Sequence, residues 1–130
     1  QNQRGLSSLY RTLGQLDEAR QWLDTAIATL ESIDPSAELA MAYSMRSAGH
    51  MLTNQWQLAE SWGKRAIALA ERFDAQGTVA HALNNIGSAL ADDGQERGFE
   101  LLQRSLAIAL EHNMHDHSRA HTTWTCMSAA

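Results

Sequence analysis

Apolar residues recur along this chain at the three- and four-residue spacings of a helix that is buried on one face. The pattern occurs three times, with the second copy forty residues after the first and the third copy thirty-nine residues after the second. The three copies are Ala19, Trp22, Leu23, Ala26 and Ile27; Ala59, Trp62, Gly63, Ala66 and Ile67; and Gly98, Leu101, Leu102, Ser105 and Leu106. Each set lies on one face of a helix, so we predict three equivalent amphipathic helices.

Turn residues separate these helices from the ones before them. Gly14, Asn54 and Gly94 lie forty residues apart and each precedes one copy of the apolar pattern. Asp34-Pro35 is typical of a helix start, and Asp17 and Asp74 are further candidate helix starts. The one-residue offset of the third copy predicts a tighter turn at Gly94-Gln95-Glu96. We predict seven helices, near residues 2–13, 17–32, 36–52, 56–72, 76–92, 96–112 and 117–129.

A repeat of this length is typical of a helical solenoid, in which each helix pair buries its apolar face against the next. Small residues recur where neighbouring helices would approach closely, at Ala19, Ala59 and Gly98 and again at Ala26, Ala66 and Ser105. The chain has 130 residues, of which 44% are hydrophobic, with one proline and few aromatic residues. This composition favours a single all-α domain over a sheet.

Charge and cysteine content restrict the function classes. The net charge is −5 at pH 7, with ten Lys and Arg against fifteen Asp and Glu, which argues against direct nucleic-acid binding. No apolar stretch reaches the roughly 20 residues of a membrane helix, and no leader pattern opens the sequence. The lone Cys126 is consistent with a reducing cytoplasm. We therefore expect a cytoplasmic protein that contacts neither membrane nor nucleic acid.

The spaced small residues resemble those of the tetratricopeptide repeat (TPR) family. Ile86-Gly87 stands at the Leu-Gly site of the first helix, and Gly98 and Ser105 stand at the small-residue sites of the second. The chain departs from the family pattern because Leu6-Ser7 and Arg46-Ser47 replace Leu-Gly and because the period exceeds the usual ~34 residues. The resemblance implies a right-handed α-α superhelix of antiparallel helix pairs, about three and a half repeats long, with units near 1–34, 35–74, 75–113 and a partial 114–130.

Two longer stretches carry a narrower resemblance. The segments AYSMRSAGHMLTNQWQLAESWGKRAIALAE and AHALNNIGSALADDGQERGFELLQRSLAIALE are similar to the repeat region of bacterial LuxR-type ATPase transcriptional regulators. That resemblance implies the regulatory repeat arm of such a regulator. The chain itself has no Gly-x-x-x-x-Gly-Lys-Ser/Thr stretch that would hold a nucleotide phosphate.

The ends of the sequence predict a piece of a longer array. The chain opens on Gln1 inside a helical pattern, and Arg119 to Ser128 reads as a first helix whose second helix is missing. Trp124 aligns with Ile86, a core position, so its apolar surface would need a partner. We therefore expect either self-association through the open C-terminal end or a frayed C-terminal segment.

The TPR resemblance implies a ligand groove on the first helices of the units, which would bind a protein or peptide. The residues at the groove positions of the second and third units are Met41, Ser44, Met45, Ala48, Met51, Leu52, His81, Asn84, Asn85, Ser88 and Asp92, with Arg4, Ser8 and Arg11 in the first unit and Thr122, Thr123 and Cys126 in the fourth. Methionines suit varied apolar side chains, and amides suit a peptide backbone. The methionines could instead be core residues, and the asparagines could be solvated or cap the backbone.

Arg46 and His50 lie four residues apart, at positions whose equivalents in the other two units are apolar residues. They could form an anion pair lining the pocket of a small-molecule effector, which is the alternative function to an interaction scaffold. Arg46 could equally pair with an acid such as Glu31 or Asp24, because an unpaired buried charge is costly.

Catalytic and metal sites have weak support. His117 and His121 lie four residues apart and could share a metal with Asp116 or Cys126, although the late histidines His112, His115, His117 and His121 also suit a polar loop. Asp92 and Asp93 point in different directions on a helix, and Cys126 and His121 are poorly aligned. We predict no enzyme activity, no cofactor and no metal.

Overall fold

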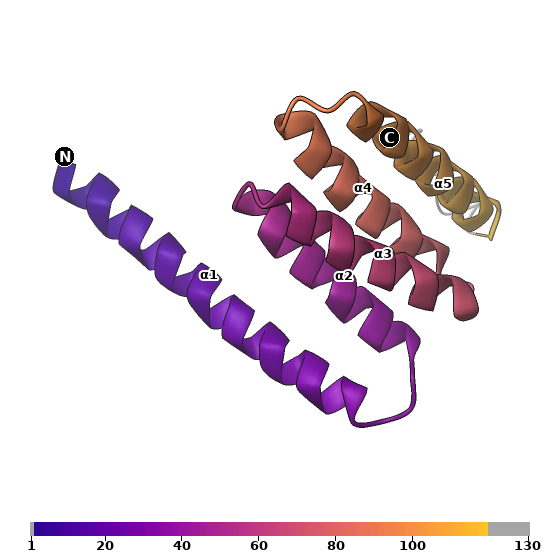
Figure 1. The fold of residues 1–130 in the computed structure, drawn as a ribbon, viewed down its shortest axis with the longest axis horizontal. Helices are drawn as coiled ribbons and strands as arrows, with labels where there is room; N and C mark the ends of the chain where they lie inside the picture. The colour runs from indigo at the N-terminus through magenta and orange to yellow at the C-terminus, as the bar shows by residue number, and fades with distance from the viewer. Residues whose placement is uncertain (1, 120–130) are drawn as a thin grey trace.

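The computed structural model describes residues 2–119, with side chains described for residues 14–112, and all regular structure in this range is helical. The helices are α1 (Asn2–Glu31), α2 (Ala37–Leu52), α3 (Trp56–Arg72), α4 (Gln76–Asp92) and α5 (Arg97–Arg119). Helices α2 and α3 pair, α4 and α5 pair, α4 packs on both α2 and α3, and α1 packs on α2 (Figure 1). This stacking confirms the predicted all-α, TPR-like helical solenoid.

The turns after α2, α3 and α4 share one backbone geometry. Each contains one residue in the left-handed region: Asn54 with φ of 59°, Asp74 with φ of 53° and Gly94 with φ of 82°. The next residue donates its N–H to a carbonyl five residues earlier at 2.9 Å, from Gln55 to His50, from Ala75 to Ala70 and from Gln95 to Leu90. This C-terminal motif satisfies helix carbonyls that would otherwise lack donors.

The predicted turn residues Asn54 and Gly94 are therefore confirmed, whereas the role predicted for Asp74 is wrong. Asp74 ends α3 in the left-handed conformation, and the residue before α4 is Ala75, which makes no side-chain capping bond. Aspartate is one of the few non-glycine residues that adopts this conformation readily, because its short polar side chain can bond locally.

The predicted turn at Gly14 is wrong, as is the helix start predicted at Asp17. Helix α1 continues through both residues, and its N-terminal half extends away from the stacked helices (Figure 1). A glycine inside a helix costs only about 1 kcal/mol, and a Cβ at Gly14 would meet nothing within 4 Å. No other described helix packs there to impose a turn, so the first two predicted helices form one.

The last described helix is longer than predicted. Helix α5 runs from Arg97 to Arg119, past the predicted boundary at residue 113, and overlaps the start of the helix predicted at 117–129. The rest of that helix, with Trp124, lies outside the described residues. The described range therefore holds five helices where the sequence pattern predicts six and the start of a seventh.

Helix α2 begins later than the Asp34-Pro35 signal predicts. Ser36 is the residue before the helix, and its hydroxyl accepts the N–H of Leu39 at 3.1 Å. Serine is among the best residues at this position, since its short side chain reaches a free donor of the first turn. Asp34 and Pro35 lie in the connection before it.

The third apolar pattern is one residue closer to its predecessor than the second is, and the start of α5 accounts for this difference. Gly98 donates its N–H to Gln95 three residues back, whereas Ala59 donates to Gln55 four residues back. The connection of residues 93–96 is no shorter than that of residues 53–55, so the turn itself is not tighter. The first turn of α5 is wound more tightly instead, in the manner of a 3₁₀-helix.

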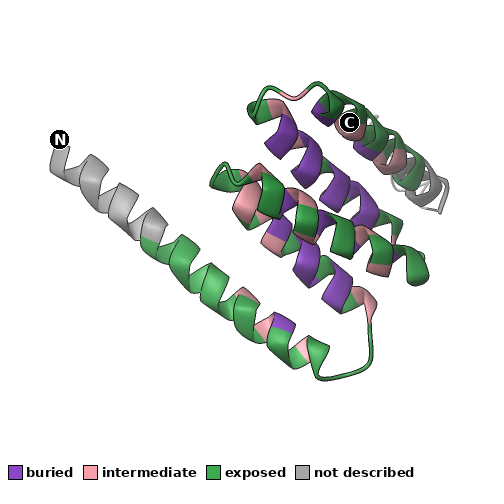
Figure 2. Cartoon of the chain, in the orientation of Figure 1, coloured by how far each residue is buried: buried purple, intermediate pink, exposed green. Residues whose placement is uncertain are grey.

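Small residues allow close packing at the centre of the stack. Ala59 and Ala66 are fully buried, as predicted, and Gly98 and Ser105 are buried at the matching levels of α5. Ala26 is half-buried, whereas Ala19 is exposed, and the prediction of a helix contact at Ala19 is wrong. Residues 2–13, which were expected to cover Ala19, continue in line with it. Burial is densest in α4 (Figure 2).

Glycines bring α4 and α5 into backbone contact. A Cβ on Gly87 would lie 2.8 Å from the carbonyl oxygen of Gly98, and a Cβ on Gly98 would lie 2.6 Å from the carbonyl oxygen of Gly87. Both distances are shorter than real Cβ contacts. The Ile86-Gly87 site identified from the TPR resemblance is therefore a point of close helix approach.

Candidate functional site

A buried polar contact joins α2 to α4. The hydroxyl of Ser44 lies 2.6 Å from Nδ1 of His81, and the amide of Asn85 donates to the Ser44 carbonyl at 2.9 Å and to its hydroxyl oxygen at 3.3 Å. Because Ser44 accepts from Asn85, its own hydroxyl hydrogen is available to Nδ1 of His81. Ser44 and Asn85 are 0% and 2% exposed, so this contact fixes the spacing of the two helices.

The other predicted groove residues reach the surface beside this contact. Met41 and Met45 are 36% and 51% exposed, His81 and Asn84 are exposed, and Ala48, Met51 and Ser88 are half-buried. They follow helical spacing on the two helices that Ser44 and Asn85 join. We call this set of seven residues the α2–α4 face. Ser44 and Asn85 are buried between the helices and do not face a ligand, which corrects that part of the predicted groove.

Arg46 binds one of the two acids that the sequence analysis named as alternatives to an anion. Its guanidinium donates to Asp24 of α1 and lies over the ring of Trp62, 4.5 Å from the ring centroid. His50 donates from Nδ1 to the amide oxygen of Gln55 at 2.8 Å. Both side chains have protein partners and belong to different contacts, so the geometry does not support an anion pair or an effector pocket around them.

Aromatic and cationic side chains hold α1 against the α2–α3 pair. Trp62 lies between Arg46 and Arg65, whose guanidinium is 4.4 Å from its ring centroid. The Tyr43 hydroxyl donates to Glu31 at 2.7 Å and accepts from Arg65 at 3.3 Å. Burial, followed by the hydrogen bond to Glu31, raises the pKa of the Tyr43 hydroxyl. Cation–π contacts of this kind add stability where water is partly excluded.

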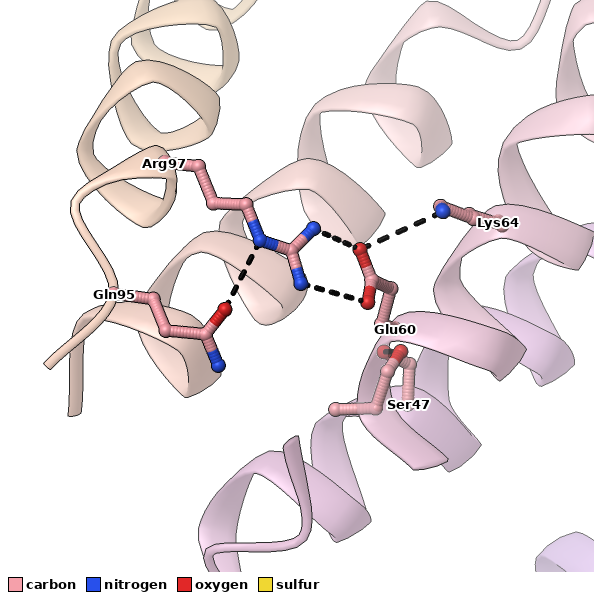
Figure 3. Close-up of polar contacts among 6 residues, drawn as sticks. Ser47, Glu60, Lys64, Gln95 and Arg97 are labelled. Atoms are coloured by element: carbon pink, nitrogen blue, oxygen red, sulfur yellow. Dashed lines mark hydrogen bonds and ion pairs between the residues drawn. The ribbon is translucent and has the colours of Figure 1, made fainter. Parts of the chain in front are cut away.

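A second ionic contact joins α3 to α5. Arg97 donates two hydrogen bonds to the carboxylate of Glu60, at 2.6 and 3.1 Å, and a third from Nε to Gln95 at 3.0 Å (Figure 3). Lys64 lies 3.5 Å from the same carboxylate, whose side chain is only 15% exposed. The Arg97 hydrogen bonds are the main reason that the pKa of Glu60 lies below its usual value.

Sequence reasoning missed this ion pair, although a signal for it exists. Glu60 and Arg97 are 37 residues apart, and so are Ser44 and His81. In a repeat of about forty residues, this separation places two side chains on neighbouring units one helical turn out of register. A search for complementary residues at that separation finds both contacts.

A shallow hollow of about 370 Å³ opens between α2 and α3. It is lined by Pro35, Leu39, Tyr43, Arg65, Ala68, Leu69 and Arg72. Neither Arg46 nor His50 lines it, so it does not provide the effector pocket predicted beside them. The α2–α4 face remains the candidate functional site.

The metal candidates cannot be placed in this geometry. The side chains of Asp116 and His117 and the whole of His121, Thr122, Thr123 and Cys126 lie outside the described residues. Within the described part of the chain, no group of three or more His, Cys, Asp or Glu side chains is arranged to hold a metal ion. The same part contains no helix that is both long and apolar enough to cross a membrane.

Comparisons with known proteins agree with this architecture. Residues 4–33, less than half of the chain, match the family model described as Tetratricopeptide repeat. No curated protein and no solved structure matches the chain. The match and the stacked helix pairs together support a TPR domain. Repeats of this class generally act as scaffolds for protein–protein interaction, and stacked repeats form extended binding surfaces.

Proposed function

We propose that this chain is a non-catalytic protein-interaction module whose α2–α4 face binds a peptide or helix of a partner protein. The observation that carries this proposal is the exposure of methionine and amide side chains directly beside the buried Ser44–Asn85 contact. Two neighbouring first helices are thereby held at a fixed spacing while their outer residues stay accessible. A rigid pair of helices with accessible side chains suits recognition of an extended partner.

The composition of the α2–α4 face indicates the chemistry of the partner. Met41 and Met45 expose flexible, polarizable side chains that adapt to apolar residues of different shapes. Asn84 offers one acceptor and two donors to a peptide backbone, and Ser88 adds a hydroxyl. A partner segment with apolar side chains on one edge and free backbone amides on the other satisfies both groups.

More specifically, we propose that the module is the regulatory repeat arm of a bacterial LuxR-type transcriptional regulator. The support is the similarity of two repeat segments to that family, and no feature of the described fold conflicts with it. In such a regulator the arm would receive a partner protein, while other parts bind nucleotide and DNA. Sequencing the gene on both sides of this chain tests the assignment. A gene without a nucleotide-binding segment before the chain and a DNA-binding segment after it refutes the arm, while leaving the interaction module intact.

The interaction module is tested by selecting a displayed library of random peptides against the chain and measuring the affinity of the selected peptides. We expect Asn84→Ala and Met51→Ala to weaken binding at least about tenfold, as for residues at the centre of an interface. The matched control is Phe99→Ala, which removes a 58% exposed side chain from α5, away from the α2–α4 face. Peptides that lose affinity with the Phe99 variant but not with the Asn84 and Met51 variants would refute the proposed face.

A further inference from the structure

One face of α1 lacks the cover that its equivalents have in the next unit. Trp22 is 76% exposed and Ala19 is exposed. Forty residues later, Trp62 is half-buried between two arginines and Ala59 is fully buried. The same residue types are therefore exposed in α1 and packed in α3, so α1 has the side chains for a contact that the described part of its own chain does not make.

The next two units show what kind of segment makes this contact. Ser47 of α2 donates its hydroxyl to the carbonyl of Ala59 at 2.6 Å. At the matching point of the following pair, Gly87 approaches the carbonyl of Gly98. Forty residues before Ser47 the chain has Ser7, and forty residues before Ala59 it has Ala19. Residues 2–13 thus carry the pattern of the helix that covers Ala59, with Ser7 as the counterpart of Ser47.

The exposed methionines of α2 fit the same missing helix. Met41 and Met45 lie forty residues before His81 and Asn85, which pack on Ser44 of the preceding first helix. Among the described helices, none packs on α2 in the place that α2 takes beside α4, and both methionines are exposed. A helix with the pattern of residues 2–13 would therefore contact α1 on one side and α2 on the other.

The chain's own residues 2–13 cannot reach this position while α1 is continuous. Ser7 and Ala19 are twelve residues apart, which separates them by about 18 Å along one helix. Yet the match to the tetratricopeptide repeat, a helix–turn–helix unit, covers residues 4–33, which lie almost entirely within α1. The segment has the sequence of a helix pair and the structure of one helix.

We propose that a second copy of the chain supplies the missing helix in a domain-swapped dimer. Residues 2–13 of each chain pack on the Ala19 and Trp22 face of the other, so that the two α1 helices lie antiparallel and cross near Gly14. Ser7 then faces Ala19 of the second copy, as Ser47 faces Ala59 within α2 and α3. Exchange of identical elements through a segment that is straight in one form and a turn in the other is a low-cost route to a dimer.

This inference does not rest on the proposed function. The docked helix leaves Asn84 and Ser88 open and extends the α2–α4 face by one unit. It covers part of Met41 and Met45, which is why the peptide-binding test uses Asn84 and Met51 instead. Loss of peptide binding and loss of the dimer are therefore separate results.

Disulfide trapping tests the proposal directly. Cysteines replace Ser7 and Ala19 in a Cys126→Ser background, and the protein is oxidised mildly and run on a non-reducing gel. A disulfide needs Cα atoms within about 7 Å, so the pair cannot form inside one continuous helix. We expect a covalent dimer, and we expect a covalent heterodimer when Ser7→Cys and Ala19→Cys copies are mixed. A disulfide within one chain, or no disulfide at all, overturns the proposal.

Two pairs of variants give an independent readout by light scattering over a range of concentrations. Trp22→Glu should weaken the dimer at least about tenfold, because a charge replaces the apolar contact. The control Phe99→Glu changes an exposed aromatic residue on α5 and should leave the dimer unchanged. Gly14→Ala, which favours the straight form of α1, should leave the dimer intact, as should Gly49→Ala at an equally open helical glycine. Equal effects of Trp22→Glu and Phe99→Glu, or loss of the dimer with Gly14→Ala, would overturn the proposal.

Discussion

Replacing Gly87 with alanine measures the backbone contact between α4 and α5. The added methyl group would lie 2.8 Å from the Gly98 carbonyl oxygen, 2.8 Å from Cγ of Leu102 and 3.0 Å from the Leu102 nitrogen. Two of these atoms belong to the α5 backbone and cannot rotate away, so the helices must separate. Overpacking of this kind costs about 1–3 kcal/mol. Alanine has a higher helix propensity than glycine, which adds about 1 kcal/mol of stability. We therefore expect the unfolding free energy to fall by between roughly zero and 2 kcal/mol.

Gly49→Ala is the matched control for this measurement. Gly49 lies inside α2, is exposed, and has open space where the Cβ would stand. Only the propensity gain of about 1 kcal/mol applies there. The two variants should therefore differ by about 1–3 kcal/mol in unfolding free energy, read from urea denaturation as a shift in midpoint with an unchanged slope. If Gly87→Ala is as stable as Gly49→Ala, the close contact of α4 and α5 is wrong.

Three further predictions concern the core and the polar contacts. Ala66→Leu should lower the unfolding free energy by about 1–3 kcal/mol in denaturant, because Ala66 is fully buried, and an unchanged midpoint would contradict its close packing. Asn85→Ala should cost about 1–3 kcal/mol by removing a buried hydrogen bond, whereas the exposed neighbour Asn84→Ala should cost nearly nothing; equal losses would mean that Asn85 does not join α2 to α4. The Glu60 pKa is lower in the folded chain, so its pairing with Arg97 stabilises the fold above the ordinary carboxyl pKa and is lost as pH falls through the lowered value. Glu60→Gln and Arg97→Gln should each reduce the loss of stability on acidification, and acid titrations that match the parent chain would count against the pair.

The sequence predicts the turns better than it predicts the helices between them. Asn54 and Gly94 are recognisable because few residues accept a left-handed backbone at low cost. Asp74 has the same role midway between them, but aspartate is also a favoured helix start, and this competing preference led to the wrong assignment. The turn predicted at Gly14 is wrong for a related reason. Glycine permits a turn without requiring one, so the contacts of the surrounding helices decide.

The candidate site is predictable where it follows the repeat and unpredictable where it depends on side-chain direction. Spacing placed Met41, Met45 and Asn84 on the accessible side of their helices. The same spacing placed Ser44 and Asn85 in the groove, although they face one another across the helix contact. Helix α4 packs on α2, the first helix of the preceding unit, whereas no described first helix precedes α2, so equivalent positions differ in exposure: Met45 is exposed and Asn85, forty residues later, is buried. A repeat unit considered alone does not contain that information.

The contacts that hold α1 against α2 and α3 were predicted only in part. Asp24 was named as a partner of Arg46 because an arginine at an apolar level needs an acid. The position of Trp62 between Arg46 and Arg65 could not be anticipated, since both arginines come from different helices and meet only after α2 and α3 have packed.

The uneven distribution of buried residues along the stack has a consequence for local opening. Helix α4 contributes ten buried residues, whereas Ile27 is the one buried residue among those described in α1. In the monomer we therefore expect amide hydrogens to exchange with solvent slowest in α4 and fastest in α1, because each helix opens at a free-energy cost set by the surface it shares with its neighbours. The α2–α4 face lies on the slowly exchanging side of this gradient. In the monomer, α1 can therefore open without disturbing a partner bound at that face.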